Sequence, residues 1–317
     1  MTTIIFAHNA FAGHETPEGH PERVDRYSAV VAALGSGDLA ALERREPPRA
    51  ARSALERAHP SAYIDRVEAA TPAQGLAALD PDTFLSPGSL DAALRGAGGA
   101  IAAVDAVAAG DATNAFVAAR PPGHHAETAR AMGFCLFNNA AIAARHARAA
   151  HGFSRIAVVD FDVHHGNGTE AIFWDDEQGF FASSHEFPQY PGTGRDTDRG
   201  AHGNIVNAPL PTGAEGGVFR RAWGETLLPA LADFEPEFVV VSAGFDGHRA
   251  DPLGGLLLVE DDFAWITREI MAVAADKAGG RVVSVLEGGY DLKALGSSAA
   301  AHVSALAGIR QAAPGLS

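Results

Sequence analysis

Short runs of β-branched and other apolar residues recur along this chain, and Ala-rich stretches separate them. The runs 237–243 and 281–286 are apolar almost throughout, as strands must be when both faces of their sheet are buried. Strands that alternate with helices predict a parallel sheet with helices on both faces. The expected strands span 3–7, 114–118, 155–161, 180–184, 204–207, 237–243 and 281–286. The expected helices span 22–35, 89–109, 138–150, 218–232, 260–277 and 292–309.

The sequence favours one α/β domain over residues 1–317. Its 317 residues, of which 47% are hydrophobic, suffice for one large core. We find no internal repeat, low-complexity linker or shift in composition that would divide the chain. In a sheet of this kind, the binding site lies at the carboxyl ends of the strands.

Charge and cysteine content limit the expected partners and compartment. A net charge of −15 argues against nucleic acid, because phosphate binding requires a basic face. The single cysteine, Cys135, cannot form an internal disulfide, which favours a reducing, cytoplasmic location. The first residues lack the basic and apolar regions of a signal peptide. The apolar stretch 97–109 contains Asp105 and is shorter than the roughly 20 residues that span a bilayer, so we expect no membrane partner and leave a homo-oligomer open.

Two carboxylates and an imidazole follow the third expected strand. Side chains alternate along a strand, so Asp160, Asp162 and His164 should point to the same side of its end. Asp246 follows the sixth expected strand and can reach the same edge. Taken singly, each of these residues fits a helix cap or a hydrogen bond in the core. As a set, Asp162, His164 and Asp246 leave a position open for water, as catalytic Zn²⁺ sites do, and they would also accept Fe²⁺ or Co²⁺.

Two further segments carry groups that handle protons. The proline-rich loop 120–126 presents His124 and His125, and histidine moves protons near neutral pH. Tyr290 follows a Gly-Gly turn after the last expected strand and can donate to an oxyanion. Taken alone, a histidine pair on a loop is more often solvent-exposed and without a catalytic role, and a tyrosine in this place could equally well pack over the sheet edge. Together with a metal, these groups predict hydrolysis of an amide or ester: the metal activates water, a histidine takes its proton and the tyrosine stabilises the oxyanion.

Seven motifs occur in an order that resembles the histone deacetylase superfamily, which includes bacterial histone-deacetylase-like amidohydrolases and acetylpolyamine amidohydrolases. They are HETPEGHPER, RPPGHHA, GFCLFNN, DFDVHHGNGTE, YPGTG, SAGFDGHRADPLGG and EGGYDL, and they extend from His14 to Leu292. The resemblance implies an arginase-like fold with a mainly parallel sheet of about eight strands. It also implies a zinc-dependent deacylase site.

The resemblance implies ligands for two ions. Asp162, His164 and Asp246 match the family's zinc ligands. Members of the family also hold a structural K⁺ through positions that match Asp160, Asp162, His164 and Ser183.

The resemblance also implies roles in catalysis. His125 matches the general base and His124 its electrostatic partner. Asp160 matches the carboxylate behind the first of these histidines, and Tyr290 matches the tyrosine that polarises the carbonyl. Asn167 stands behind the second histidine, where class I members carry an aspartate, and this should leave His125 less basic.

Residues at the pocket mouth bear on the substrate. Phe134, beside Gly133, and Tyr190 match the aromatic walls of an acyl-lysine tunnel. Asp82 resembles the rim residue that accepts backbone N–H groups from a peptide substrate. Leu253 stands where polyamine-selective members often place a glutamate, which favours acyl-lysine or neutral acyl amides.

Three alternatives to a lysine deacylase remain. An acetylpolyamine amidohydrolase would use the same chemistry, and a non-catalytic acyl-lysine or metabolite-binding relative would use the same pocket. A binuclear ureohydrolase needs further aspartates where this chain has Gly166 and His248, so a single metal is favoured.

Overall fold

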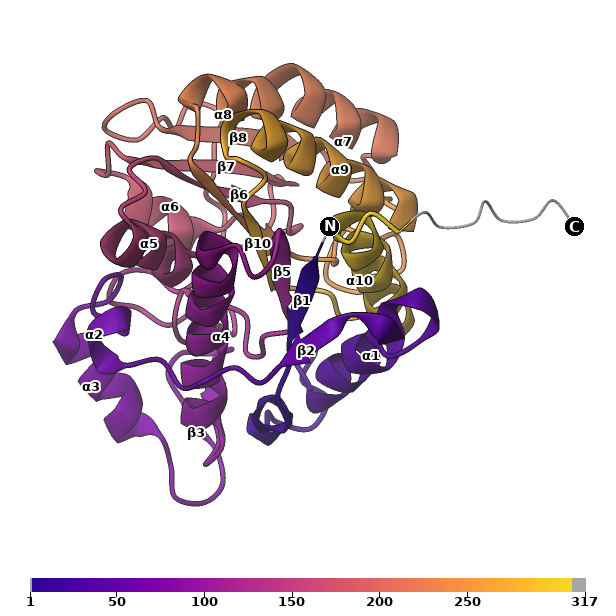
Figure 1. Ribbon diagram of the computed structural model, residues 1–317. Coiled ribbons are helices and arrows are strands. Elements are labelled where there is room, and N and C mark those ends of the chain that lie inside the picture. Colours follow the sequence, from indigo (N-terminus) through magenta and orange to yellow (C-terminus); the bar gives the residue numbers. More distant parts are fainter. Residues whose placement is uncertain (1, 310–317) are drawn as a thin grey trace, which may run out of the picture.

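The computed structural model describes residues 2–309, and eight strands within them form one parallel central sheet (Figure 1). Their order across the sheet is β2-β1-β5-β10-β9-β6-β7-β8. Every neighbouring pair runs parallel. The strands are β1 (Thr3–Phe6), β2 (Glu43–Arg45), β5 (Asn114–Val117), β6 (Ile156–Asp160), β7 (Gly179–Glu186), β8 (Ile205–Leu210), β9 (Phe238–Ala243) and β10 (Val282–Leu286). The predicted mainly parallel α/β sheet is confirmed.

Helices cover both faces of the sheet, because the side chains of each strand alternate between two apolar clusters. In β1, Ile5 joins one cluster, whereas Ile4 and Phe6 join the other. The first cluster packs against α1 (Val24–Leu34), α7 (Gly216–Ala222), α8 (Leu228–Phe234), α9 (Glu260–Lys277) and α10 (Leu292–Leu306). The second packs against α2 (Arg52–Leu55), α3 (Ser61–Ala70), α4 (Ser89–Ala109), α5 (Asn139–His151) and α6 (Asn167–Phe173).

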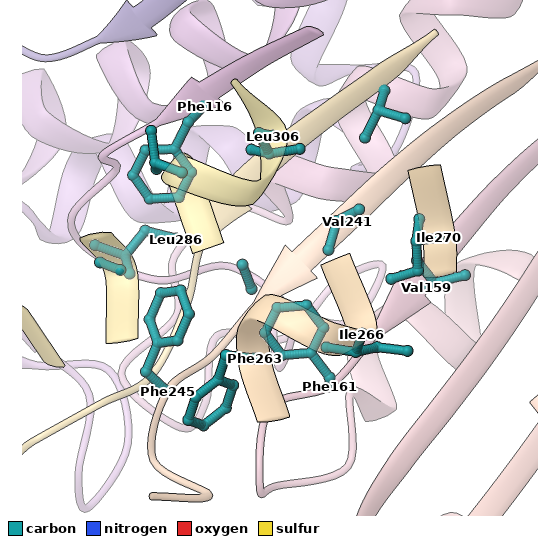
Figure 2. Close-up of a cluster of buried hydrophobic side chains, with 14 of the residues drawn as sticks. Phe116, Val159, Phe161, Val241, Phe245, Phe263, Ile266, Ile270, Leu286 and Leu306 are labelled. Atoms are coloured by element: carbon teal, nitrogen blue, oxygen red, sulfur yellow. The ribbon is translucent and has the colours of Figure 1, made fainter. Parts of the chain in front are cut away.

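Aromatic side chains anchor the strand ends on the first face. Figure 2 shows Phe161, Phe245 and Phe263 together in this core, and Phe161 and Phe245 follow β6 and β9 in the chain. The ring centroids of Phe245 and Phe263 lie 5.3 Å apart in an edge-to-face arrangement. Because Phe161 and Phe245 each point into the core, the aspartates that follow them are held at the edge of the sheet.

The core helix α4 overturns one argument from the sequence. It has 21 residues and a window of mean hydropathy 1.3, so by length and composition it could cross a membrane. In the fold, 61% of that window is buried, and the helix packs against α5. The helix is apolar because it is buried in the core. The argument that its apolar stretch is too short to span a bilayer was wrong.

Most predicted element bounds agree with the structure to within two residues. The strand expected at 204–207 continues to Leu210, because β8 stays paired with β7 as far as Glu186. The helix expected at 292–309 ends at Leu306, just before Gly308 takes a left-handed φ of 68°. The helix expected at 218–232 comprises α7 and α8, joined by a π turn over Trp223–Leu227.

Six helices and strands were not expected. They are β2, α2, α3, α6 and the short antiparallel pair β3 (Ala77–Ala78) and β4 (Phe84–Leu85). The sequence of β2 is Glu-Arg-Arg, which carries no apolar pattern because this strand lies at the edge of the sheet.

Candidate active site

The loops after β5, β6, β9 and β10 carry most of the predicted site residues, and these strands are neighbours in the sheet. A pocket of about 220 Å³ opens near their carboxyl ends. It is lined by Asp82, His125, Gly133, Phe134, His164, Gln189, Tyr190, Leu253 and Tyr290. Every residue in this lining except Gln189 was predicted from the sequence.

Asp162, His164 and Asp246 are buried beside the pocket, which His164 lines, and each offers one ligand atom within 4.8 Å of the other two. His164 Nδ1 lies 3.2 Å from Asp162 Oδ1 and 3.1 Å from Asp246 Oδ2. Ligands of a tetrahedral Zn²⁺ at bond lengths of about 2.0 Å are separated by about 3.3 Å. The spacing of the three donors therefore fits a single cation between them.

Electrostatics also favours a cation at this position. Burial and the neighbouring negative charge of Asp162 raise the pKa of Asp246 to about 7. A divalent ion would offset this cost of placing two carboxylates together in the interior. Backbone wraps closely around both groups, since a Cβ at Gly244 or Gly288 would overlap a carboxylate oxygen. The donor set and its surroundings fit a metal ion.

The path by which these residues converge differs from the prediction. The sequence placed Asp160, Asp162 and His164 along one strand, but β6 ends at Asp160 and the chain then bends. Asp160 Oδ1 accepts the N–H of Asp162 at 3.0 Å, and Asp162 Oδ1 accepts the N–H of His164 at 2.9 Å. Two successive aspartate turns, and not strand alternation, bring the groups together.

The two histidines of the 120–126 loop have different surroundings. His124 Nδ1 lies 2.9 Å from Asp160 Oδ2. Burial lowers the pKa of His124, but the charges of Asp162 and Asp160 outweigh burial and raise it to about 10. Burial, together with the positive charges of His124 and His164, lowers the pKa of His125 well below its ordinary value. Such divergence is typical of a neutral base beside a charged partner.

Hydrogen bonds fix the tautomer of His125. The side-chain amide of Asn167 donates to Glu127 Oε1 at 2.9 Å, which turns its oxygen toward His125. His125 Nδ1 lies 2.8 Å from that oxygen and must therefore carry a hydrogen. The unshared electron pair of neutral His125 is on Nε2, the nitrogen that does not contact Asn167.

Tyr290 closes the base of the pocket. Burial raises the pKa of its hydroxyl well above 10, so the group stays a proton donor. The Arg26 guanidinium stacks on the ring at 4.8 Å from its centroid, and Arg26 Nε donates to the Gly289 carbonyl at 2.6 Å. Asp251 Oδ2 accepts the backbone N–H of Tyr290 at 2.6 Å.

Comparison with known proteins agrees with the resemblance found in the sequence. A model of the histone deacetylase domain matches residues 20–306. The chain belongs to this family.

Relatives of the chain carry matching names. A histone deacetylase-like amidohydrolase of Pseudomonas aeruginosa is 40% identical over 302 residues, which cover 93% of this chain and 78% of that protein. A probable deacetylase of Archaeoglobus fulgidus is 38% identical over 299 residues, covering 92% and 82%. The crystal structure of the HDA15 HD domain superposes with a TM-score of 0.91 at 33% identity, covering 97% of this chain and 88% of that one. The protein is therefore a deacetylase or amidohydrolase of the histone deacetylase family, which is generally metal-dependent and acts on acetylated substrates.

The predicted walls of the family's tunnel line the pocket. The Tyr190 ring stands perpendicular to the His125 ring, with centroids 5.2 Å apart. Phe134 packs edge-on against Tyr290 at 5.8 Å. Asp82 is half-buried, and its Oδ1 accepts the N–H of Gly133 at 3.2 Å. One carboxylate oxygen of Asp82 therefore binds the backbone beside Phe134. The predicted contact of Asp82 with a peptide substrate would use the second carboxylate oxygen.

Gln189 is the pocket residue that the sequence reasoning missed. Its Nε2 donates to the Leu253 carbonyl at 3.2 Å, and its Oε1 accepts the N–H of Tyr190 at 3.0 Å. The side chain therefore connects the two loops of the pocket mouth. The only feature of the sequence that could have indicated Gln189 as a pocket residue is its position directly before Tyr190.

Two of the predicted K⁺ ligands lie on neighbouring strands, and the other two, Asp162 and His164, follow β6. Asp160 and Ser183 are paired in register between β6 and β7. The Ser183 hydroxyl lies 2.9 Å from His185 Nδ1. The K⁺ assignment of Asp160, Asp162, His164 and Ser183 stays a prediction.

A second His–Asp group among residues 2–309 lies apart from the pocket, between α4 and α5. Asp105 Oδ1 is 2.6 Å from His146 Nε2 and 2.7 Å from His151 Nε2. Arg57, which can only donate, lies 2.6 Å from His146 Nδ1, so the hydrogen of neutral His146 is on Nε2. A protonated Nε2 cannot bind a metal, so we interpret this group as hydrogen bonds between the two helices.

Proposed function

We propose that the protein is a zinc-dependent deacylase that removes acetyl or other acyl groups from acyl-lysine or related small amides. One observation carries the proposal. His125, His164 and Tyr290 line one pocket, and Asp162 and Asp246 each offer a ligand atom within 4.8 Å of one on His164, which supports a cation, a base and a hydroxyl donor acting together.

The shape of the pocket supports an acyl-amine substrate. Phe134 and Tyr190 line a volume of about 220 Å³ whose base is formed by polar groups. An extended methylene chain fits between aromatic walls by apolar contact, and an amide at its end can reach the base. A side chain of acylated lysine has both parts.

Asp162, His164 and Asp246 would hold a divalent ion, which would supply Lewis acidity for the acyl carbonyl and for a water molecule. His125 Nε2 takes the proton of the attacking water, since Asn167 holds the hydrogen of the ring on Nδ1. The Tyr290 hydroxyl donates to the carbonyl oxygen as that oxygen gains negative charge. As the water oxygen bonds to carbon and the C–N bond breaks, a histidine returns the proton to the leaving amine.

The pocket mouth supports acyl-lysine over acetylpolyamine. Leu253 lines the mouth where a second ammonium would need a carboxylate, and the Gln189 amide is already engaged with its neighbours. Asp82 is the acidic group in the lining, which leaves the acetylpolyamine activity as the alternative.

The test is hydrolysis of an acetyl-lysine peptide and of N-acetylputrescine by zinc-loaded protein, each compared with Tyr290→Phe. We expect turnover of the peptide, and a loss on the order of 10²–10³ in kcat when the hydroxyl donor is removed. Preference for N-acetylputrescine would replace the proposal with a polyamine amidohydrolase. Binding of both compounds without turnover would favour the non-catalytic relative.

Zinc as the ion, K⁺ as a structural ion and a cytoplasmic location are parts of the same proposal. The mixed carboxylate and imidazole donors support Zn²⁺, with Fe²⁺ and Co²⁺ as alternatives that metal analysis of the purified protein would identify. The single cysteine, which is buried, supports a reducing compartment.

A further inference from the structure

Glu287 is a fully buried carboxylate to which no step of the proposed reaction gives a role. It directly follows β10, and β10 lies between β5 and β9 in the sheet. The two neighbouring strands lead into the histidine pair and into Asp246, and β10 itself leads into Tyr290. Glu287 therefore stands where three segments of the site leave the sheet.

The carboxylate contacts both neighbouring segments. Glu287 Oε2 accepts the backbone N–H of Gly123 at 2.6 Å and that of His124 at 3.1 Å. Glu287 Oε1 accepts the Ser242 hydroxyl of β9 at 3.2 Å. One side chain thus links the histidine segment, β9 and the segment that carries Tyr290.

The histidine segment depends on these contacts. The N–H groups of Gly123 and His124 are shielded from water, so without Glu287 they would lose their acceptor. The segment is tightly enclosed on its other side, where a Cβ at Gly123 would come within 2.8 Å of the Phe137 carbonyl and 2.7 Å of the Asn139 nitrogen. A displaced segment would carry both imidazoles away from the base of the pocket.

We propose that Glu287 is a positioning residue, which holds the His124–His125 segment in register with Tyr290 by accepting two backbone hydrogen bonds. The inference rests on the proposed deacylase function for its kinetic consequence. Its structural part, the restraint on the histidine segment, does not depend on the reaction.

Two substitutions separate hydrogen bonding from charge. Glu287→Gln removes the charge but keeps one oxygen that can accept from Gly123 and His124, and its amide can donate to Ser242. Glu287→Ala removes both the charge and the acceptor.

Glu237 offers a control for the loss of a backbone-binding carboxylate at the opposite end of the sheet. It directly precedes β9, and one of its oxygens accepts the backbone N–H groups of Ser154 and Arg155, which precede β6. Glu237→Ala therefore also removes a carboxylate that accepts two backbone N–H groups, but at a solvent-exposed position far from the pocket.

The experiment measures kcat on an acetyl-lysine peptide, bound metal, and backbone hydrogen exchange of the segment 118–127 in all three variants and the parent. For Glu287→Ala we expect a kcat loss on the order of 10²-fold, as small misplacements of reacting groups produce. Its metal content should equal that of the parent, and the histidine segment should exchange faster. Glu287→Gln and Glu237→Ala should stay within a few-fold of the parent in kcat and match its exchange.

Equal exchange in Glu287→Ala and the parent would overturn the proposal, and so would a kcat in Glu287→Gln as low as that of Glu287→Ala. A parent without turnover would reject the deacylase function instead, and the exchange comparison would still decide the role of Glu287.

Discussion

Single residues with unusual backbone angles shape the pocket. Gly133 has a φ of 56° and Phe134 a φ of 69°, and the second is costly for a residue with a side chain. Both backbone N–H groups are held, that of Gly133 by Asp82 and that of Phe134 by the Thr83 hydroxyl at 3.1 Å. The strained turn directs the Phe134 ring into the pocket and leaves room for His125.

Gly133→Ala should therefore impair activity. A Cβ at Gly133 would overlap the His125 ring, so the imidazole must move. We expect a kcat loss on the order of 10²-fold with unchanged metal content, because the base is displaced.

Gly110→Ala is the matched control for this change. Gly110 has a φ of 80° but open space where a Cβ would lie, so it carries the same backbone strain without the collision. Equal kcat in the two variants would show that the contact with His125 is unimportant.

At the scale of elements, apolar runs predicted seven of the eight strands of the sheet described in residues 2–309. A strand buried on both faces must be apolar, so its sequence reports its position. The edge strand β2 has no such requirement, and Glu43, Arg44 and Arg45 gave no signal. The helix α3 could have been found from the spacing of Tyr63, Ile64 and Val67, whereas α6 begins inside the site motif at Asn167 and was concealed by it.

The candidate site residues could be predicted because they lie close to the ends of predicted strands. Asp162, His164 and Asp246 are close to strand ends that the apolar runs had already placed. Gln189 and Glu287 were not foreseen, because an amide that connects two loops and a carboxylate that binds backbone are visible only when the neighbouring segments are in place.

The contact between α4 and α5 should make stability depend on pH. Partial burial favours the neutral form of Asp105, but hydrogen bonds from His146 and His151 outweigh burial and lower its pKa. A carboxylate with a lowered pKa stabilises the fold above its unfolded pKa, and this contribution disappears as the pH falls through the folded value.

Asp105→Asn should therefore lower the free energy of unfolding at about pH 7, and the difference should shrink toward about pH 3, below the ordinary aspartate pKa of about 3.9. The effect should stay below about 1 kcal/mol, because the group is half exposed and water screens it. Urea unfolding of both proteins at the two pH values measures it. A difference of the same size at both values would contradict the pKa shift.

The whole molecule should respond to metal through its stability. Asp162 and Asp246 are forced together by folding, and an ion that binds the folded chain alone stabilises it by about 2.7 kcal/mol at 100 times its Kd. Added Zn²⁺ should raise the Tm of metal-free protein, with one ion bound per chain. Asp246→Ala should bind no metal at the site and show no rise. A full rise in Tm in that variant would remove Asp246 from the ligand set.

The position of β10 sets the order in which the molecule can be completed. It is the last strand in the described chain, yet it lies at the centre of the sheet, with β2, β1 and β5 on one side and β9, β6, β7 and β8 on the other. A nascent chain that has left the ribosome only as far as β9 has its histidine pair on one unfinished sheet and its candidate metal ligands on another. Because contacts so distant in sequence carry a large loop-closure cost, a sheet of this order is expected to fold slowly. The sheet is therefore continuous, with the histidine pair and the candidate metal ligands on adjoining strands, only once β10 stands between the two halves.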